Sequence, residues 1–315
     1  MKKKTILALG SLLPAEMDAL EKSFDLIRLW KEPNPEAVLQ AYKNDIIGIL
    51  SAYNGIPVTA RILESLPNLE IVAQFGVGVD NIDLGAAKAR GIAVTNTPDI
   101  LTPDTADIAL SLILCLMRRI VEADMYVRVG KWASGAFSLS SSLSGKTVGI
   151  VGMGRIGRAI ARRCLAFDMK IVYHGPRQKP DLTYPYFADL RQMAEASDVL
   201  VMACPGGPET KNLVTGKILK ALGPKGYLVN IARGSVVNTE DLLIALRNRD
   251  IAGVGLDVYE NEPNVPEALI SMDNVVLLPH VGSATAETRS EMGRLVIANI
   301  LAYFEGKPLL TAVEL

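Results

Sequence analysis

A short apolar segment that runs directly into a glycine-rich turn constrains the fold of this chain more than any other feature. The β-like run Thr147–Val151 is followed by Gly152-Met153-Gly154-Arg155-Ile156-Gly157, which has the pattern G-x-G-x-x-G. Apolar residues at helical spacing come next, namely Ile160, Ala161, Cys164 and Leu165. This pattern between a strand and a helix predicts a parallel α/β unit that binds a dinucleotide, and a ligand-free glycine turn is the weaker alternative.

Each of the three glycines has its own physical task in such a turn. Gly152 permits the tight turn from strand to helix, Gly154 lets the backbone approach a pyrophosphate, and Gly157 lets the helix pack against the strand. The unpaired N–H groups at the start of the helix face the phosphates, and the helix dipole adds to the attraction. We therefore expect a dinucleotide cofactor at this turn.

The composition is that of a folded protein large enough for two domains. Of the 315 residues, 49% are hydrophobic and 21% are charged, and this balance argues against disorder. The formal net charge is −1, so charge gives no reason to expect nucleic acid or an acidic membrane as a partner. No apolar run approaches the ~20 residues of a membrane-spanning helix.

The three cysteines point to a reducing compartment. Cys115, Cys164 and Cys204 lie in apolar runs and show no C-x-x-C spacing. They are expected to be buried free thiols in a cytoplasmic protein, and no metal site is expected.

Alternating strand-like and helix-like segments predict two parallel α/β domains. In the first hundred residues the expected strands are Thr5–Leu9, Ile46–Leu50, Ile71–Gln74 and Ala93–Asn96. Later in the chain they are Thr147–Val151, Lys170–Tyr173, Asp198–Ala203, Tyr227–Ile231, Gly253–Val258 and Val275–Leu278.

Two long helices are predicted to connect these domains. One begins near Thr102-Pro103-Asp104, residue types that suit a helix N-terminus, and continues toward Tyr126. The other begins near Thr285 and is expected to return to the first domain through its apolar face. The predicted domains are therefore 1–101 plus 286–315 and 102–285, with a cleft between them.

Charged side chains follow three strands of the second series. Arg233 follows the fourth strand, Glu262 the fifth and His280 the sixth. Ligands of open parallel sheets bind outside the carboxyl ends of the strands. A guanidinium binds a carboxylate through paired hydrogen bonds, a histidine delivers a proton near neutral pH, and a carboxylate stabilises the imidazolium. This set suffices to reduce a 2-oxo acid, although each residue alone would be read as an ordinary surface or core residue.

Five motifs together resemble the D-isomer-specific 2-hydroxyacid dehydrogenases over nearly the full chain. They are Gly76-Val-Gly-Val-Asp80-Asn-Ile-Asp83, the glycine-rich block at 152–157, Asn230-Ile-Ala-Arg-Gly234, Leu256-Asp-Val-Tyr-Glu-Asn-Glu-Pro263 and Leu278-Pro-His-Val-Gly-Ser-Ala-Thr285. Within the family the chain looks most like the glyoxylate/hydroxypyruvate reductases. The resemblance implies two Rossmann-like parallel-sheet domains, a flavodoxin-like substrate domain and a dinucleotide-binding domain.

The resemblance also implies roles for individual residues. Arg233 would bind the carboxylate and carbonyl of the substrate, His280 would be the acid/base with Glu262 as its partner, and Asp257 would hold the nicotinamide carboxamide. The expected product is a D-2-hydroxy acid.

The remaining expected ligand contacts lie in both domains. The resemblance implies that the backbone N–H groups of Val77 and Gly78 bind the substrate carboxylate, and Ser51 is expected in the pocket wall. The expected cofactor-binding residues are Gly152, Met153, Gly154, Arg155, Ile156, Gly157, His174, Arg177, Cys204, Pro205, Ile231, Ala232, Asp257 and Gly282.

The end of the second strand in the second series predicts which nicotinamide cofactor is used. NAD-specific folds usually place an acidic residue about 20 residues beyond the first glycine. Here the position holds His174, and no carboxylate follows until Asp181. Arg177, with Lys179 nearby, could bind a 2′-phosphate. We expect NADPH to be preferred and NADH to remain possible, and a solvated basic loop is the alternative reading.

Substrate size is left open by the sequence. The small residues Ser51 and Ala52 fit glyoxylate or hydroxypyruvate, whereas a roomier pocket would take an aryl pyruvate, as in a hydroxyphenylpyruvate reductase. A non-catalytic, nucleotide-sensing binding protein is the alternative from another class. The resemblance also implies a homodimer in which residues around Trp132 to Phe137 of a second subunit close the site. A packing residue at the dimer interface is the simpler reading of Trp132.

Overall fold

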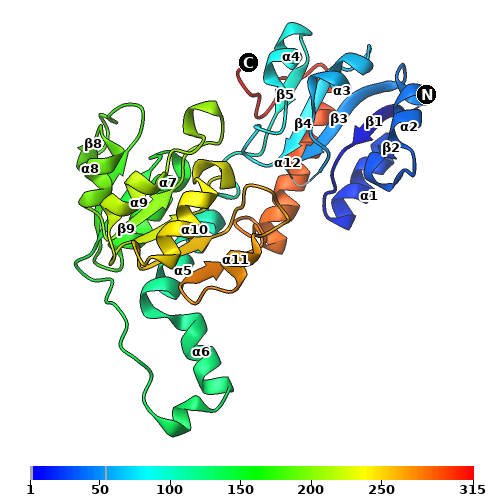
Figure 1. Cartoon of the computed structure of the whole chain (residues 1–315). Helices are drawn as coiled ribbons and strands as arrows, with labels where there is room; N and C mark the ends of the chain where they lie inside the picture. Colours follow the sequence, from blue (N-terminus) through cyan, green and yellow to red (C-terminus); the bar gives the residue numbers. More distant parts are fainter. Residues whose placement is uncertain (1–2, 54) are drawn as a thin grey trace. The chain divides into compact units, whose positions relative to one another are not determined.

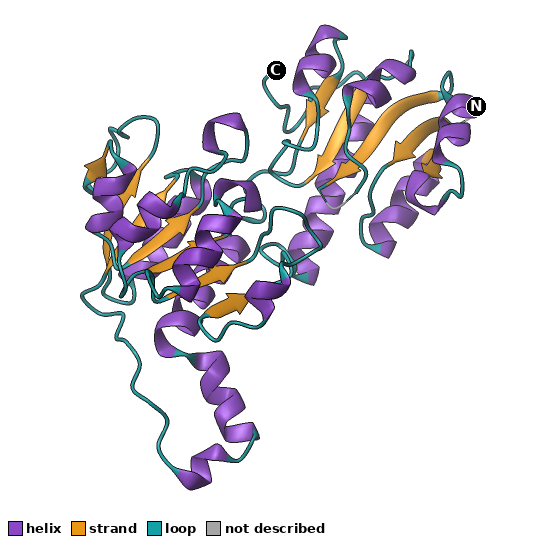
Figure 2. Cartoon of the chain, viewed as in Figure 1, coloured by secondary structure: helices purple, strands orange, loops and turns teal. Residues whose placement is uncertain are grey.

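The computed structural model describes residues 3–53 and 55–315, which form two compact units. The first unit comprises Met1–Leu101 with Ala284–Leu315, and the second comprises Thr102–Ser283. In each unit, strands are flanked by helices (Figure 2). The second crossing between units falls after Ser283, two residues before the predicted boundary. The ligand-binding roles assigned to the two domains stay predictions.

The first unit is built on a five-stranded parallel sheet with the order β2-β1-β3-β4-β5 (Figure 1). This 2-1-3-4-5 order is the flavodoxin-like arrangement. The strands are β1 (Lys4–Ala8), β2 (Phe24–Arg28), β3 (Ile46–Ala52), β4 (Ile71–Phe75) and β5 (Ala93–Thr95).

Successive side chains along these strands point to opposite faces of the sheet, and helices cover both faces. Leu7, Ile49 and Val72 pack toward three helices, α2 (Pro35–Tyr42), α3 (Ala60–Ser65) and α4 (Leu84–Ala89). Ile6, Leu50 and Ala73 pack toward α1 (Pro14–Ser23) and α12 (Ala286–Phe304). The C-terminal helix therefore covers one face of the first sheet.

The second unit is built on a seven-stranded parallel sheet with the order β12-β11-β10-β9-β6-β7-β8. The strands are β6 (Thr147–Val151), β7 (Lys170–His174), β8 (Tyr186–Phe187), β9 (Val199–Met202), β10 (Tyr227–Asn230), β11 (Gly253–Leu256) and β12 (Val275–Leu277). The strand order reverses between β6 and β9, which is the position where doubly wound sheets bind dinucleotides. The predicted α/β class, with two parallel sheets, is confirmed.

Helices cover both faces of this sheet as well. Val148 and Ile150 pack toward α5 (Thr102–Arg118) and α7 (Arg155–Leu165). Val151 and Leu200 pack toward α8 (Leu190–Glu195), α9 (Gly216–Leu222), α10 (Thr239–Arg247) and α11 (Glu267–Ile270).

Two edge strands were not predicted from the sequence. β2 pairs with β1 through Phe24–Arg28, but only Phe24 of its residues is fully buried. β8 is two residues long and pairs with the end of β7. Edge strands expose one side to solvent, so neither segment carries the continuous apolar run that indicates a central strand.

The predicted helix from Thr102 to Tyr126 is wrong in its length. α5 ends at Arg118, and a separate helix, α6 (Ile120–Arg128), begins after Arg119. Arg119 has a φ of 52°, a left-handed conformation that interrupts the helix. Its Nε donates to Glu122 Oε2 at 2.7 Å, and its guanidinium lies 4.7 Å from the ring centre of Phe137. These tertiary contacts fix the break, which no Gly or Pro in the sequence indicates.

The C-terminal helix begins close to the predicted residue. The Oγ1 atom of Thr285 accepts a hydrogen bond from the N–H of Thr288 and caps α12. Among the described residues, no helix combines the length and the apolarity needed to cross a membrane.

Candidate active site

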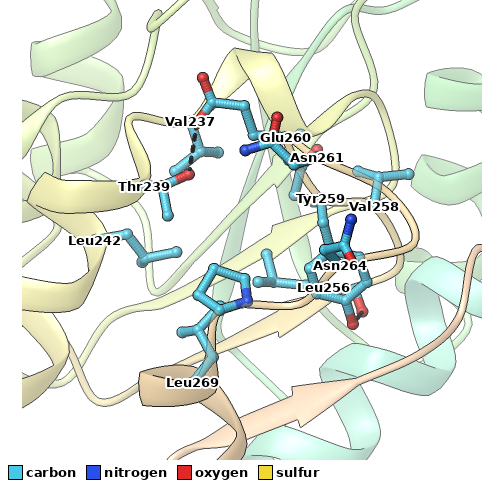
Figure 3. A pocket seen from close by; sticks show the side chains of 13 residues that line it. Val237, Thr239, Leu242, Leu256, Val258, Tyr259, Glu260, Asn261, Asn264 and Leu269 are labelled. Carbon is cyan, nitrogen blue, oxygen red and sulfur yellow. Dashed lines mark hydrogen bonds between the residues drawn. The ribbon is translucent and has the colours of Figure 1, made fainter.

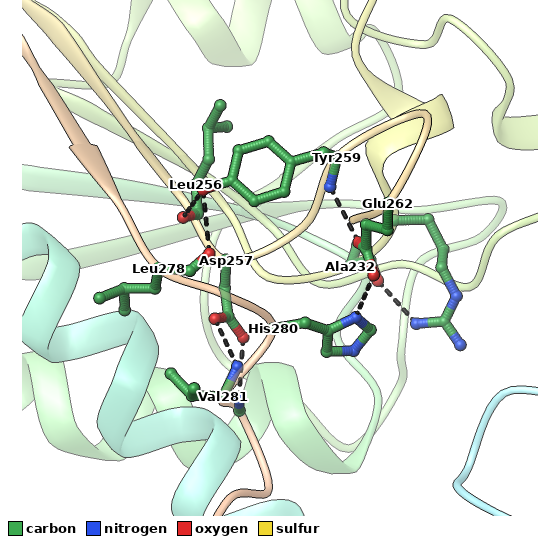
Figure 4. Close-up of polar contacts among 10 residues, drawn as sticks. Ala232, Leu256, Asp257, Tyr259, Glu262, Leu278, His280 and Val281 are labelled. Atoms are coloured by element: carbon green, nitrogen blue, oxygen red, sulfur yellow. Dashed lines mark hydrogen bonds and ion pairs between the residues drawn. The ribbon is translucent and has the colours of Figure 1, made fainter. Parts of the chain in front are cut away.

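The three candidate catalytic residues follow three neighbouring strands of the second sheet. Arg233 follows β10, Glu262 follows β11 and His280 follows β12, and these strands lie side by side in the order β12-β11-β10. Figure 4 shows the resulting cluster of polar side chains. Because carboxyl ends of parallel strands share one edge of the sheet, residues distant in sequence come together.

His280 and Glu262 form a direct pair. Nδ1 of His280 lies 2.7 Å from Oε2 of Glu262, so the imidazole N–H donates to the carboxylate. The other carboxylate oxygen, Oε1, accepts a hydrogen bond of 2.9 Å from the backbone N–H of Tyr259. The side chains are 34% and 19% exposed, so the pair is only partly screened by water.

A buried carboxylate holds the backbone on one side of His280. Oδ1 of Asp257 accepts the N–H of Val281 at 2.7 Å, and Oδ2 accepts the N–H of Gly282 at 2.8 Å. Burial raises the pKa of Asp257, while these N–H groups and the charge of His280 act in the opposite direction. His280 itself has a φ of 54°, a left-handed conformation that is uncommon for a residue with a side chain.

Two further side chains hold the same loop. The hydroxyl of Thr105, on α5, donates to the carbonyl of Gly282 at 3.0 Å. The hydroxyl of Tyr259 donates to the carbonyl of Leu278 at 2.9 Å, and burial raises the pKa of Tyr259 to about 12. The backbone is thus tied both before and after His280. The implied contact of Asp257 with a carboxamide stays a prediction, since in this structure its oxygens bind the His280 loop.

The turn that carries Arg233 is organised by an asparagine. Asn230 is 1% exposed; its Nδ2 donates to the carbonyl of Arg233 at 2.8 Å, and its Oδ1 accepts the N–H of Ala232 at 3.0 Å. The guanidinium donates through Nη1 to the carbonyl of Ala232 at 2.7 Å. A Cβ at Gly234 would lie 1.9 Å from the carbonyl carbon of Tyr259, so only glycine lets the two loops approach.

The glycine-rich turn has the geometry that a dinucleotide requires. Gly152 has a φ of 96°, and a Cβ there would lie 2.6 Å from the backbone nitrogen of Cys204. A Cβ at Gly157 would lie 2.2 Å from the carbonyl oxygen of Gly152, so a side chain would separate the helix from the strand. A Cβ at Gly154 would meet no atom within 4 Å, which leaves open space beside that backbone for a pyrophosphate. The turn therefore fits the cofactor that the motif predicts.

The end of β7 lies beside this turn. The N–H of Gly152 donates to the carbonyl of His174 at 3.0 Å, and Nδ1 of His174 is 2.9 Å from the carbonyl of Phe187. The next carboxylate in the sequence, Asp181, pairs with Arg158 at 2.7 Å. That hydrogen bond lowers the pKa of Asp181.

The loop after β9 contains one of the three free cysteines. Burial raises the pKa of Cys204 to about 11, so its thiol stays protonated at neutral pH. Cys164 is fully buried, whereas Cys115 and Cys204 are partly exposed. The prediction of three buried thiols is therefore correct in full only for Cys164.

A small cavity lies next to the candidate site (Figure 3). Its volume is about 50 Å³, and its lining includes Asn230, Gly234 and Tyr259. Thr239 donates from its hydroxyl to Oε2 of Glu260 at 3.0 Å across this wall. The cavity is far below the several hundred Å³ that small-molecule sites occupy.

In the first unit, the loop Gly76–Gly78, hereafter the 76–78 loop, has every carbonyl bonded. The carbonyl of Gly76 accepts the N–H of Thr97 at 2.9 Å, that of Val77 accepts Nδ2 of Asn96 at 2.9 Å, and that of Gly78 accepts Nε2 of Gln74 at 3.0 Å. In a trans peptide the C=O and the next N–H point in opposite directions. These bonds therefore orient the N–H groups of Val77 and Gly78, which donate to no acceptor within residues 3–53 and 55–315.

Ser51 belongs to the support of this loop. It is fully buried, and its Oγ accepts Nδ2 of Asn81 at 3.1 Å. Asn81 in turn accepts Nε2 of Gln74 at 2.9 Å. Direct contact of Ser51 with a substrate stays a prediction.

Several residues that hold the candidate ligand-binding loops within each unit were not assigned a role from the sequence. Asn230, Tyr259 and Thr105 hold the loops of the second unit, and Gln74, Asn81 and Asn96 hold the 76–78 loop. The usable signal was a polar residue inside an apolar strand, as at Gln74 and Asn230. Across the part of the chain that the structure describes, no group of three or more His, Cys, Asp or Glu side chains could hold a metal ion.

Known proteins resemble this chain along nearly all of its length. Residues 110–282 match the NAD binding domain of the D-isomer specific 2-hydroxyacid dehydrogenases. The chain is 49% identical to glyoxylate/hydroxypyruvate reductase A of Arabidopsis thaliana, over 93% of this chain and 94% of that protein. It is 46% identical to the hydroxyphenylpyruvate reductase of Plectranthus scutellarioides, over 97% and 99% of the two chains.

A solved structure agrees with both sequence and fold. The NADPH-dependent glyoxylate/hydroxypyruvate reductase of Sinorhizobium meliloti, in complex with NADP and malonate, superposes with a TM-score of 0.93. The two sequences are 45% identical, and the match covers 99% of this chain and 97% of that one. The chain is therefore an NAD(P)-dependent oxidoreductase that belongs to the D-isomer-specific 2-hydroxyacid dehydrogenase family, in its glyoxylate/hydroxypyruvate reductase branch.

Proposed function

We propose that the chain reduces a small 2-oxo acid, glyoxylate or hydroxypyruvate, to the D-2-hydroxy acid, with NADPH as the preferred cofactor. One observation carries the proposal: His280 is paired with Glu262 at 2.7 Å, and Arg233 follows the adjacent strand. Relatives named as glyoxylate/hydroxypyruvate reductases support the choice of substrate.

The chemistry is divided among these side chains. The reduced nicotinamide supplies a hydride for C2 of the oxo acid. The guanidinium of Arg233 binds the substrate carboxylate and polarises the adjacent carbonyl. Nδ1 of His280 donates to Glu262, so Nε2 is the nitrogen that delivers the proton to the substrate oxygen. The negative charge of Glu262 stabilises the imidazolium before that transfer.

The 76–78 loop supplies the second contact for the substrate carboxylate. The N–H groups of Val77 and Gly78 are adjacent donors. The carbonyls of the same two peptide units, those of Gly76 and Val77, point the opposite way and are bonded there. Two neighbouring backbone N–H groups with this arrangement bind anionic oxygens well. We assign the carboxylate of the 2-oxo acid to them.

The preference for NADPH is supported by the surroundings of β7. His174 occupies the position where NAD-specific folds carry an acid, and the nearby Asp181 is paired with Arg158. Arg177 is exposed in the following loop. That loop is fixed where the N–H of Lys179 donates to the hydroxyl of Tyr173 at 2.8 Å, and where the hydroxyl of Tyr186 donates to the carbonyl of Gly175 at 3.0 Å. The guanidinium is therefore available for a 2′-phosphate.

The substrate is tested by turnover of glyoxylate, hydroxypyruvate and phenylpyruvate with each cofactor. We expect the two small acids to give the higher kcat/KM. Higher turnover of phenylpyruvate would favour the aryl alternative, and the absence of hydride transfer to any oxo acid would favour a nucleotide-sensing binding protein.

The cofactor is tested by the ratio of kcat/KM for NADPH to that for NADH. The wild type should favour NADPH, and Arg177→Ala should lower the ratio by roughly tenfold because it removes a charge-assisted hydrogen bond to phosphate. Arg191→Ala is a matched control, because Arg191 is an exposed arginine on α8 that pairs with Glu195. A wild type that favours NADH would refute the preference.

A homodimer is also proposed, with α6 and the segment after it as the interface. α6 has no fully buried residue, and it leads away from the sheet of the second unit (Figure 1). Exposed apolar side chains gather there, namely Ile120, Val121, Met125, Val127, Val129, Trp132 and Leu139. Apolar patches of this kind mark protein interfaces. Light scattering should give twice the mass of one chain, and Val121→Glu should lower it.

A further inference from the structure

Residues near the C-terminus bond directly to Asn96, one of the residues that hold the 76–78 loop. We propose that the C-terminal segment Leu310–Val313 positions this loop for the substrate carboxylate and that Thr311 is the positioning residue. The inference rests on the proposed role of Val77 and Gly78 in binding the 2-oxo acid. All the contacts that carry it lie within the first unit.

The C-terminal segment is attached to the edge of the first sheet. The N–H of Val313 donates to the carbonyl of Val94 at 2.8 Å, and Ala312 forms an antiparallel bridge with Thr95. The N–H of Asn96 donates to the carbonyl of Thr311 at 3.3 Å. The segment therefore continues the sheet beyond β5, and its Thr311 lies beside Asn96, the residue that follows that strand.

The hydroxyl of Thr311 forms hydrogen bonds with two asparagines. Its hydroxyl donates to the backbone carbonyl of Asn96 at 2.7 Å and accepts Nδ2 of Asn299 at 2.8 Å. A hydroxyl can donate and accept at the same time, so threonine or serine can fill both roles whereas valine can fill neither.

Asn299 anchors this arrangement to α12. It is fully buried, and its Oδ1 accepts the N–H groups of Leu310 and Thr311 at 3.0 and 3.2 Å. Its Nδ2 also donates to the carbonyl of Leu295 at 3.0 Å. A buried amide with all of its groups bonded fixes the turn that brings Thr311 to Asn96.

Asn96 connects the hydrogen bonds of Asn299 and Thr311, hereafter the relay, to the 76–78 loop. Its Nδ2 donates to the carbonyl of Val77 at 2.9 Å. That carbonyl shares a peptide plane with the N–H of Gly78, so its bond fixes the direction of one of the two proposed carboxylate donors. The contacts thus run from α12 through Thr311 and Asn96 to the N–H of Gly78.

The test compares two substitutions that differ by one hydroxyl. Thr311→Val keeps the shape of threonine and removes both hydrogen bonds, whereas Thr311→Ser keeps them. We expect Thr311→Val to raise KM for glyoxylate by about tenfold, the value of one lost hydrogen bond. kcat and the Kd for NADPH should stay close to wild type, because the loop binds substrate and transition state alike. Thr311→Ser should behave as wild type.

A second measurement separates positioning from general destabilisation. Asn96→Ala removes the side-chain bond to Val77 and keeps the backbone carbonyl that Thr311 contacts. In that background Thr311→Val should raise KM no further, because the path of contacts from Thr311 to the carbonyl of Val77 is already broken. Hydrogen–deuterium exchange of a peptide spanning residues 75–82 should be faster in Thr311→Val and unchanged in Thr311→Ser, and this readout needs no turnover.

The outcomes distinguish this inference from the proposed function. Equal KM values for Thr311→Val and Thr311→Ser, or additive effects of Thr311→Val and Asn96→Ala on KM, would overturn the positioning role. Unchanged exchange of the 75–82 peptide in Thr311→Val would overturn it as well. An inactive wild type would instead overturn the proposed function and leave the exchange measurement to decide whether Thr311 holds the loop.

Discussion

The two units organise their candidate ligand contacts in opposite ways. In the first unit, neutral side chains hold a backbone: Gln74 and Asn96 bond the carbonyls of the 76–78 loop and orient its N–H groups. In the second unit, the backbone and a buried carboxylate hold reactive side chains: Asp257 fixes the loop of His280, and the N–H of Tyr259 fixes Glu262.

The difference follows from what each contact is proposed to do. A backbone N–H does not titrate, so it can bind a carboxylate at any pH at which the loop is folded. A proton donor must titrate, and a side chain such as imidazole is needed for that. Substitution of the residue that contacts the substrate should therefore reduce activity strongly in the second unit and only slightly in the first.

The largest expected effect is that of His280→Ala. Loss of the proton donor should lower kcat for reduction by about 10²- to 10⁴-fold. The Kd for NADPH, measured by fluorescence, should be retained, and this is the control for a folded cofactor site. A near-normal kcat would show that another group delivers the proton.

The next effect is that of Asp257→Asn. The NH2 group of the asparagine would have to face the N–H of Val281 or of Gly282. Two donors cannot bond each other, so one of the bonds that hold the His280 loop is lost. We expect kcat to fall on the order of tenfold or more, the value of one misplaced buried hydrogen bond. If only the Kd for NADPH changes, Asp257 acts on the carboxamide and does not position His280.

Glu262→Gln should lower kcat for reduction on the order of tenfold, because Nδ1 of His280 would then donate to a neutral amide and not to a carboxylate. The measurement is kcat for the oxo acid, with the Kd for NADPH as the control for a folded cofactor site. An unchanged kcat would mean that the charge of Glu262 does not contribute to proton transfer.

The smallest expected effect is that of Val77→Ala in the first unit. The proposed contact is the N–H, which alanine keeps, so KM for the oxo acid should stay within roughly twofold of wild type. A tenfold rise would mean that the valine side chain contacts the substrate, and the contrast between the units would then be lost.

Much of this architecture could be predicted from the sequence because central parallel strands are buried on both faces. Segments such as Ile46–Leu50 and Val148–Val151 are continuous apolar runs, and the glycines after β6 specify a turn with its own backbone requirements. The edge strands β2 and β8 and the break at Arg119 were missed, since each depends on tertiary contacts and not on a local pattern.

The candidate site was predicted unevenly for a similar reason. Arg233, Glu262 and His280 carry charges at strand ends, and their placement after adjacent strands agrees with that reading. Asn230 and Tyr259 act through single hydrogen bonds to backbone groups, and no spacing in the sequence shows which carbonyl a buried amide or hydroxyl will reach. The relay from Asn299 to Asn96 joins residues about two hundred positions apart, so only the folded chain reveals it.

The break at Arg119 has a consequence for how the chain behaves on dilution. A helix of nine residues without a buried side chain, such as α6, gains little from its own sequence, since isolated helices shorter than about 12–15 residues are marginal in water. If a second copy of the chain covers α6, helix formation there becomes linked to association by mass action. Amide exchange in residues 120–128 would then quicken as the protein is diluted, while the central strands keep their protection.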